Sequence, residues 1–523
     1  MALKLKLSVP VSKRSLPKEV ATSPRKARAW VESLPLTRAT EAARELAQNL
    51  DALNHAKLEP EERVAVVDTY RTVAAVIFEE LEAIYANANL PLPPKAREAA
   101  DAAHLLHTQF AFAYKLYLLE RTGKLIVFNA KKHITPLLLR VLQHLRGIIG
   151  VAYKTYQPVP IGVWQESHQV FRYALEHALE SLRIDATEKD TVRDVYVEVV
   201  MLSLADPCRF TPKDMSRTQD ILRLNRGFVD LHAEGGAGNT QKHFRVALES
   251  DQAPTPPQNP ASAKATGEWR LVDPSRLVER LAQRKPISGG KAAANRTAEE
   301  IADLTARLVR LWGDPPKRQF HRHPTDSLAS VCSGVRALAH FAEVAESLGD
   351  GPGFNEHQTR PMATLPPVTV TSSTFASEDW QVLNQSTNGL RLRRVGDGRV
   401  GICVGEAVGV RAVGARQWQV GVVRWLTMLE TNTIEFGVEL ISSSMRPMGI
   451  QPPTNTSITR LVPAVLLGAG EDEGAFDMLL APVDTYAPAR EFTYGEGPLT
   501  KRGRASTLVE RTARFDLFQT ESA

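Results

Sequence analysis

The N-terminal part of the chain repeats apolar residues at the spacing typical of amphipathic helices. In residues 40–56, Ala43, Leu46, Leu50 and Leu53 follow one another at intervals of three and four positions, which places them on one helix face. Similar runs continue to Asn225 and are separated by short joints. Residues 37–230 are therefore predicted to form an all-helical domain, built as a bundle or a solenoid-like stack.

The pattern is interrupted after about Asp230. Residues 231–296 are rich in Gly, Pro, Ser and Ala and are predicted to be a linker that contains one short helix. A further amphipathic helix follows, with Thr297 as its predicted N-cap and Gly313 as its stop.

Beyond Pro315 the pattern changes to short apolar alternations between glycines, which is typical of antiparallel strands. Residues 297–451 are predicted to form a β-barrel domain with a preceding helix and an insertion near residues 342–378. Residues 452–523 are a β-rich extension that either enlarges this barrel or forms a separate one. The fold class is thus multidomain α+β.

Composition supports a folded protein of several domains. The chain has 523 residues, 43% of them hydrophobic and 24% charged, and this length exceeds one ordinary core. The net charge of +5 is small for this length, so DNA binding is not expected. Residues 1–36 are polar, basic and rich in Pro and Ser, and are predicted to be a flexible arm.

The three cysteines Cys208, Cys332 and Cys403 form no CxxC pair, so buried thiols in a cytoplasmic protein are expected. The N-terminus lacks the apolar core of a secretory signal, and no uncharged apolar run is long enough for membrane insertion.

Patterns for conventional chemistry are weak. The glycines before Lys291 do not match a phosphate-binding loop, and His321 and His323 lack the further ligands that zinc requires. His104 and His107 lie in an apolar helical run and are expected to be packed or half-exposed. No catalytic residue, metal or cofactor is predicted.

Two fragments remain. Arg318 and Arg322 are four residues apart, and two guanidinium groups can grip phosphate or the O6 and N7 edge of guanine. Asn384, Ser386 and Gly389 form an NxSxxG pattern suited to a tight turn that meets a ligand. Taken singly, the first fragment is also compatible with a solvated basic turn and the second with an ordinary hairpin.

In this order the two fragments resemble the PilZ family of bacterial receptors for cyclic di-GMP, whose pattern is RxxxR followed by [D/N]xSxxG on a six-stranded barrel. The runs GVVRW (421–425) and GVEL (437–440) are similar to the family's late hairpin. The resemblance covers about residues 311–448. The two motifs are farther apart than is usual, and the insertion accounts for the difference.

The resemblance implies a non-enzymatic signal-transduction protein that binds cyclic di-GMP through Arg318, Arg322, Asn384, Ser386 and Gly389. The helical domain, for which the sequence pattern identifies no family, would relay the signal to an unknown protein partner. Two alternatives stay open. One is an adaptor with a barrel that binds no nucleotide, and the other is an enzyme that uses the arginines to clamp a phosphorylated substrate.

Overall fold

The computed structural model describes most of the chain in ordered segments. It covers residues 4–11, 20–122, 130–185, 187–233, 243–256, 267–283, 292–314, 322–349, 375–395, 398–415, 417–430, 433–451, 461–468, 478–496 and 499–522. The chain divides into two compact units, Met1–Ala88 with Leu92–Lys317 and Asn89–Pro91 with Arg318–Ala523.

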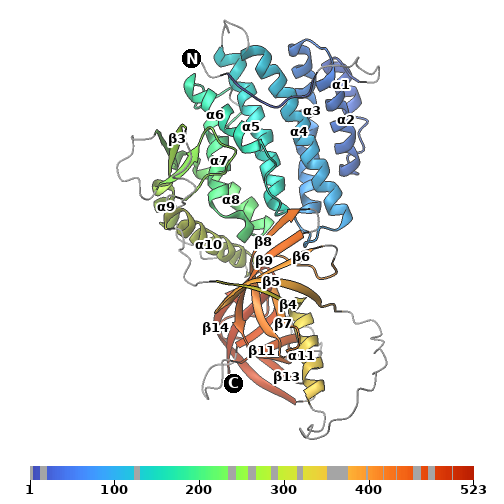
Figure 1. The fold of residues 1–523 in the computed structure, drawn as a ribbon, viewed down its shortest axis with the longest axis vertical. Helices are drawn as coiled ribbons and strands as arrows, with labels where there is room; N and C mark the ends of the chain where they lie inside the picture. Colours follow the sequence, from blue (N-terminus) through green and yellow to red (C-terminus); the bar gives the residue numbers. More distant parts are fainter. Residues whose placement is uncertain are drawn as a thin grey trace. The chain divides into compact units, whose positions relative to one another are not determined.

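The first unit is mainly helical (Figure 1). Its described elements are α1 (Pro24–Val31), α2 (Ala39–His55), α3 (Pro60–Tyr85), α4 (Pro94–Thr122), α5 (Ala130–Lys154), α6 (Val163–Glu176), α7 (Val192–Leu204), α8 (Pro212–Asn225), β1 (Asp230–Ala233), β2 (Phe244–Ala247), β3 (Trp269–Asp273), α9 (Ser275–Ala282) and α10 (Ala292–Gly313), with 3-10 turns at Pro207–Arg209 and Arg226–Phe228.

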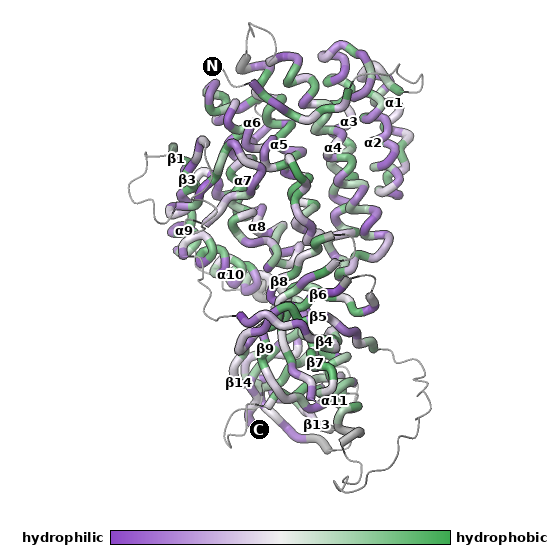
Figure 2. Tube along the Cα trace, in the orientation of Figure 1, coloured by the Kyte–Doolittle hydropathy of each residue, from purple (hydrophilic) through white to green (hydrophobic). Residues whose placement is uncertain are grey.

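Apolar periodicity sets the packing of these helices. On α2 the predicted face is fully buried, since Ala43, Leu46, Leu50 and Leu53 are all 0% exposed. Helix α4 packs against α2, α3 and α5 and buries residues around most of its circumference, so it is the central helix of the unit. Figure 2 shows the apolar stretches running along these neighbouring helices.

The helix starts follow local chemistry. Helix α3 begins with Pro60 and carries Glu61 and Glu62 in its first turn, where acids interact favourably with the helix dipole. Helix α7 begins with a capping box: Asp194 N donates to Thr191 Oγ1 at 3.1 Å, and Thr191 N donates to Asp194 Oδ2 at 3.0 Å.

Parts of the basic N-terminal segment are ordered. Leu5 and Leu7 are buried, and the backbone N–H of Ser8 donates to Glu166 Oε1 at 2.6 Å. The other Glu166 oxygen accepts from the buried ammonium of Lys115. Alternating apolar residues within the predicted arm therefore find a core, which its overall composition does not indicate.

The predicted linker region also contains structure. Strands β1, β3 and β2 form a three-stranded antiparallel sheet in that order. Helix α10 lies in the first unit, where Trp312 Nε1 donates to Met201 O at 3.1 Å, whereas its position in the sequence groups it with the barrel. The fully buried indole of Trp312 explains this attachment.

One helix, α5, is long and apolar enough over Lys132–Lys154 to cross a membrane on length and composition. About two thirds of that window is buried inside the protein, as in the core helix of a helical domain.

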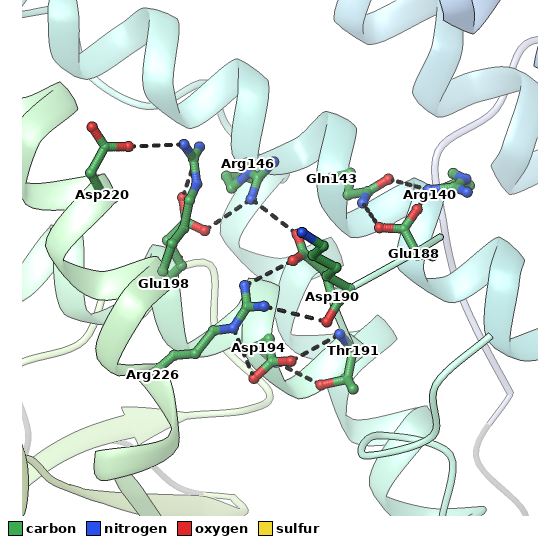
Figure 3. Close-up of polar contacts among 12 residues, drawn as sticks. Arg140, Gln143, Arg146, Glu188, Asp190, Thr191, Asp194, Glu198, Asp220 and Arg226 are labelled. Atoms are coloured by element: carbon green, nitrogen blue, oxygen red, sulfur yellow. Dashed lines mark hydrogen bonds and ion pairs between the residues drawn. The ribbon is translucent and has the colours of Figure 1, made fainter. Parts of the chain in front are cut away.

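An ion pair with a buried carboxylate joins α5 to α7 (Figure 3). Arg146 Nη1 lies 2.9 Å from Glu198 Oε2, and the Glu198 side chain is fully buried. Arg226 reaches Asp190 at 2.9 Å and Asp194 at 3.3 Å in the same network. A buried carboxylate needs such a partner because desolvation penalises the charged form.

The second unit contains two closed six-stranded barrels. The first has the strand order β4-β5-β6-β9-β8-β7 and the second β10-β11-β12-β15-β14-β13. The elements are β4 (His323–Ser333), α11 (Val335–Gly349), β5 (Glu378–Ser386), β6 (Gly389–Val395), β7 (Ala407–Ala412), β8 (Gln419–Glu430), β9 (Thr433–Ser442), β10 (Met445–Ile450), β11 (Val462–Leu467), β12 (Met478–Pro482), β13 (Glu491–Glu496), β14 (Leu499–Arg511) and β15 (Phe515–Ser522).

The predicted fold class is confirmed: a helical N-terminal domain precedes an antiparallel barrel and a further β-rich part. The β-rich part forms its own barrel, which resolves the alternative left open above. The predicted insertion begins within α11, and residues 350–374 lie outside the described ones.

Two histidines contact each other in the first unit, where His144 is buried and His107 is half-buried. His107 Nδ1 and His144 Nδ1 are 3.2 Å apart, and His107 stacks on Phe78 with ring centroids separated by 3.7 Å. Burial lowers the pKa of His107 to about 3, with smaller contributions from Arg146 and His104, and lowers the pKa of His144 well below its ordinary value. Both rings therefore stay neutral in the folded protein at physiological pH.

The lowered pKa of His107 predicts that the protein loses stability in mild acid. Below pH 6.5 the unfolded chain binds protons that folded His107 does not, so stability falls as pH drops from 6.5 toward 3, by roughly 2 kcal/mol for this residue at pH 5. We expect urea midpoints at pH 7.5 and 5 to show a smaller difference in His107→Gln than in wild type. The exposed His133→Gln on α5 is the control, and an unchanged pH dependence in His107→Gln would contradict the prediction.

The Arg146–Glu198 pair gives a second prediction. Arg146→Ala leaves the buried Glu198 without its closest partner, with Arg223 at 3.5 Å as the remaining cation, and should lower the free energy of unfolding by about 1–3 kcal/mol. Replacing both residues, as Arg146→Met with Glu198→Leu, removes the unpaired charge and should recover most of that loss. Denaturation curves of the three proteins test this, and a double variant as unstable as the single one would refute the desolvation argument.

Candidate functional site

The pairing of β4 with β5 brings the two sequence motifs to neighbouring strands. His323 lies opposite Gln385, and Pro324 lies opposite Asn384. Arg322 is exposed and immediately precedes His323, so it belongs to the same end of the barrel as the β5–β6 turn. Arg318 lies outside the described residues.

The NxSxxG motif forms the tight turn between β5 and β6. Ser386 and Gly389 face each other across this turn, and Ser386 Oγ donates to Gly389 O at 3.3 Å. Leu440 N on β9 donates to Asn388 O at 2.9 Å and so fixes the turn to the next strand. The hydroxyl and the turn backbone are thus held in place by the barrel.

Gly389 is favoured by the limited space around it and not by its backbone conformation. A Cβ at this position would meet Val438 O at 3.2 Å and Ser386 Oγ at 3.3 Å. The residue is not among those with positive φ, so the left-handed conformation that the sequence allows is not used. Strand β9 runs so close to the turn that a side chain would require a small shift of its neighbours.

Asn384 begins a row of residues that crosses four strands. A bulge at Leu383 shifts the register, and Asn384 lies opposite Arg391 on β6. Arg391 lies opposite Gly437 on β9, which in turn lies opposite Trp425 on β8. Asn384 Oδ1 is buried and has no hydrogen-bond partner in the described part of the protein, which leaves an acceptor for a ligand donor.

Arg391 and Trp425 form a flat surface in this row. The Arg391 guanidinium carbon lies 5.8 Å from the centre of the Trp425 ring, and Gly437 between them has no side chain. A Cβ on Gly437 would overlap the indole nitrogen of Trp425. The glycine therefore makes room for an arginine–indole stack.

The carboxylate of Glu435 holds the guanidinium groups of two arginines. Its side chain is fully buried, and Arg391 Nε donates to Oε2 at 2.9 Å while Arg393 Nε donates to Oε1 at 2.6 Å. Two guanidinium groups on one carboxylate leave net positive charge, and the Arg391 side chain is 36% exposed. This surface suits an anionic, planar ligand.

The local sequence pattern indicates no role for Arg391, Trp425 or Glu435. The runs GLRLRR and GVVRW alternate as outward-facing strand positions do, but their meeting across Gly437 depends on a register that local pattern does not give. The predicted late hairpin itself is present, since residues 421–425 on β8 pair with residues 437–440 on β9.

The second unit contains two cysteines, of which Cys332 is buried and Cys403 is half-buried. Burial raises the pKa of Cys332 to about 12, and burial with the nearby Glu406 carboxylate raises that of Cys403 to about 12. These thiols stay protonated at neutral pH and are poor nucleophiles. Across the described ranges, no three residues of the types His, Cys, Asp or Glu are grouped to hold a metal ion.

Comparisons with known proteins match both parts of the chain. Residues 25–234 match the family model described as the N-terminal domain of the cyclic-di-GMP receptor FimW, and residues 369–447 match the model described as its middle PilZ domain. The cyclic-di-GMP receptor FimW of Pseudomonas aeruginosa is 22% identical over 487 residues, which cover 82% of this chain and 79% of that protein. No solved structure matches.

These matches confirm the PilZ resemblance for the barrel and extend similarity to the helical domain, which the sequence pattern left unassigned. The matched models and the relative are described as receptors, which are binding proteins and not enzymes. The alternative of an enzyme with arginine clamps is therefore not supported.

The row of residues across the barrel predicts that replacing Gly437 by a larger residue destabilises the protein. Gly437→Ala should displace Trp425, lower stability by about 1–3 kcal/mol through overpacking, and change the tryptophan emission spectrum. Gly150→Ala is the control, because a Cβ there meets nothing within 4 Å and helix α5 favours alanine. Equal stability and spectra for the two variants would show that Gly437 is not required by the stack.

Proposed function

We propose that this protein is a receptor for cyclic di-GMP. The similarity of two regions to domains of a cyclic-di-GMP receptor supports this proposal. The binding residues that we propose are Arg318, Arg322, Asn384, Ser386 and Gly389, and the ligand is a signal and not a cofactor.

The observation that carries the proposal is the register of β4 against β5. It pairs His323 with Gln385 and Pro324 with Asn384, so Arg322 and the NxSxxG turn border one surface although more than 60 residues separate them in the chain. In an antiparallel sheet, residues opposite each other are about 5 Å apart, which is within the span of one dinucleotide.

Cyclic di-GMP matches the chemistry of this surface. It has two phosphates and two guanine bases, and arginine donates in parallel pairs to phosphate oxygens or to guanine O6 and N7. The unpartnered Asn384 Oδ1 can accept from a guanine N–H, and Ser386 Oγ can donate to a phosphate. The exposed edge of the Arg391–Trp425 stack can support a base by stacking.

We further propose that the helical domain carries the output. Residues 25–234 match a receptor domain that is separate from the PilZ domain, which supports a second module with its own task. The task proposed here is relay to a protein partner, and neither DNA nor membrane insertion is part of the proposal. The cysteines of the described residues are unpaired, which fits a reducing cytoplasm.

Calorimetry with cyclic di-GMP tests the binding site. Arg322→Ala and Ser386→Ala should each weaken binding about tenfold or more, because each removes a hydrogen bond to a charged group. Arg502→Ala, which removes an exposed arginine on β14, is the matched control and should bind as wild type does. Absence of binding by the intact chain, or equal affinity of Arg322→Ala and Arg502→Ala, would reject the proposal in favour of a non-binding adaptor.

A further inference from the structure

The two barrels follow the same path. Numbered in chain order, the strands of each barrel are arranged 1-2-3-6-5-4, since β4-β5-β6-β9-β8-β7 and β10-β11-β12-β15-β14-β13 correspond one to one. The second barrel is thus a repeat of the first in topology, although its sequence lacks both motifs. Its second, third and sixth strands, β11, β12 and β15, correspond to β5, β6 and β9.

The face that would correspond to the candidate site is apolar in the second barrel. Val465 on β11 lies opposite Leu480 on β12, which lies opposite Leu517 on β15. All three are buried, yet they point away from the barrel interior, which is filled by another cluster that includes Leu479 and Phe518. This row corresponds to Asn384, Arg391 and Gly437 of the first barrel.

Helix α11 and the first barrel cover this apolar face. One continuous core cluster joins Leu480 and Leu517 to Leu338 of α11 and to Ala407 and Val422 of the first barrel. Helix α11 packs against β10, β11 and β12 as well as against β4 and β7. At the border of the cluster, Arg424 Nη2 donates to Glu510 Oε2 at 2.9 Å.

The same helix is tied to the strands of the candidate site. Helix α11 follows β4 after the single residue Gly334, whose φ of +93° makes the sharp turn, and Gly334 N donates to Ala407 O at 2.8 Å. In the chain α11 lies between β4, which begins beside Arg322, and β5, which carries Asn384. A fixed α11 therefore anchors the C-terminal end of β4, whose N-terminal end begins beside Arg322.

We infer that the second barrel is a non-binding copy of the first, whose corresponding face clamps α11 and thereby holds the site strands in place. The chain then has one ligand site. The inference rests on the proposed function for its ligand.

The number of ligand sites is tested by measuring cyclic di-GMP binding to a variant that lacks two of the proposed site residues. In the full-length chain, Arg322→Ala combined with Ser386→Ala should abolish saturable binding of cyclic di-GMP. Residual saturable binding that is removed by a further substitution in β11, β12 or β15 would overturn the inference. A lack of binding by the wild-type chain would instead reject the proposed function, and the clamp would be judged by the ligand-free measurement below.

Leu480→Ala and Leu479→Ala form a matched pair for the clamp. The two leucines are adjacent and both fully buried, but Leu480 faces α11 and Leu479 faces the barrel interior. Both variants should lose similar stability. Only Leu480→Ala should weaken ligand binding, roughly two- to thirtyfold, which is the range of coupling through packed side chains.

Hydrogen exchange without ligand gives the independent readout. Leu480→Ala should accelerate exchange of backbone amides in α11 and β4 relative to Leu479→Ala. Equal exchange in these segments, or equal ligand affinity of two variants that both stay folded, would refute the clamp. If Leu480→Ala does not fold, Leu480→Met against Leu479→Met provides the same comparison with less loss of volume.

Discussion

The antiparallel pairing of β4 with β5 is the constraint on which the candidate site depends. The two motifs are distant along the chain, and backbone hydrogen bonds between these strands decide which of their residues are neighbours. A slip of one residue would turn every side chain of β4 to the opposite face. Buried Ala329 and Val331, with the half-buried Ser330 between them, oppose such a slip.

The sequence predicted what local pattern encodes. The buried face of α2 and the β8–β9 hairpin follow from apolar spacing and strand alternation. The motif residues Asn384, Ser386 and Gly389 were also found from sequence, because a tight turn leaves a recognisable set of small polar residues. Their presence at one barrel end depended on the resemblance to a family and not on periodicity.

Long-range register and burial could not be predicted in the same way. Glu435 appears in the sequence as an ordinary strand acid, and only the pairing of β6 with β9 places it beneath Arg391 and Arg393. Leu5 and Leu7 belong to a segment whose composition indicates an arm, yet a carboxylate on α6 holds the neighbouring Ser8. In each case the deciding partner is far away in the sequence and is selected by tertiary packing.

Barrel closure has a consequence for how a protein could recognise this one. A closed barrel has no strand with an unpaired row of backbone groups, so another chain cannot extend it. In the three-stranded sheet of the first unit, β2 also has a bridge from Arg245 to Thr255 on its outer side. Among the described strands, the outer edge of β1 is therefore where a partner could add a strand, and recognition elsewhere must use side chains.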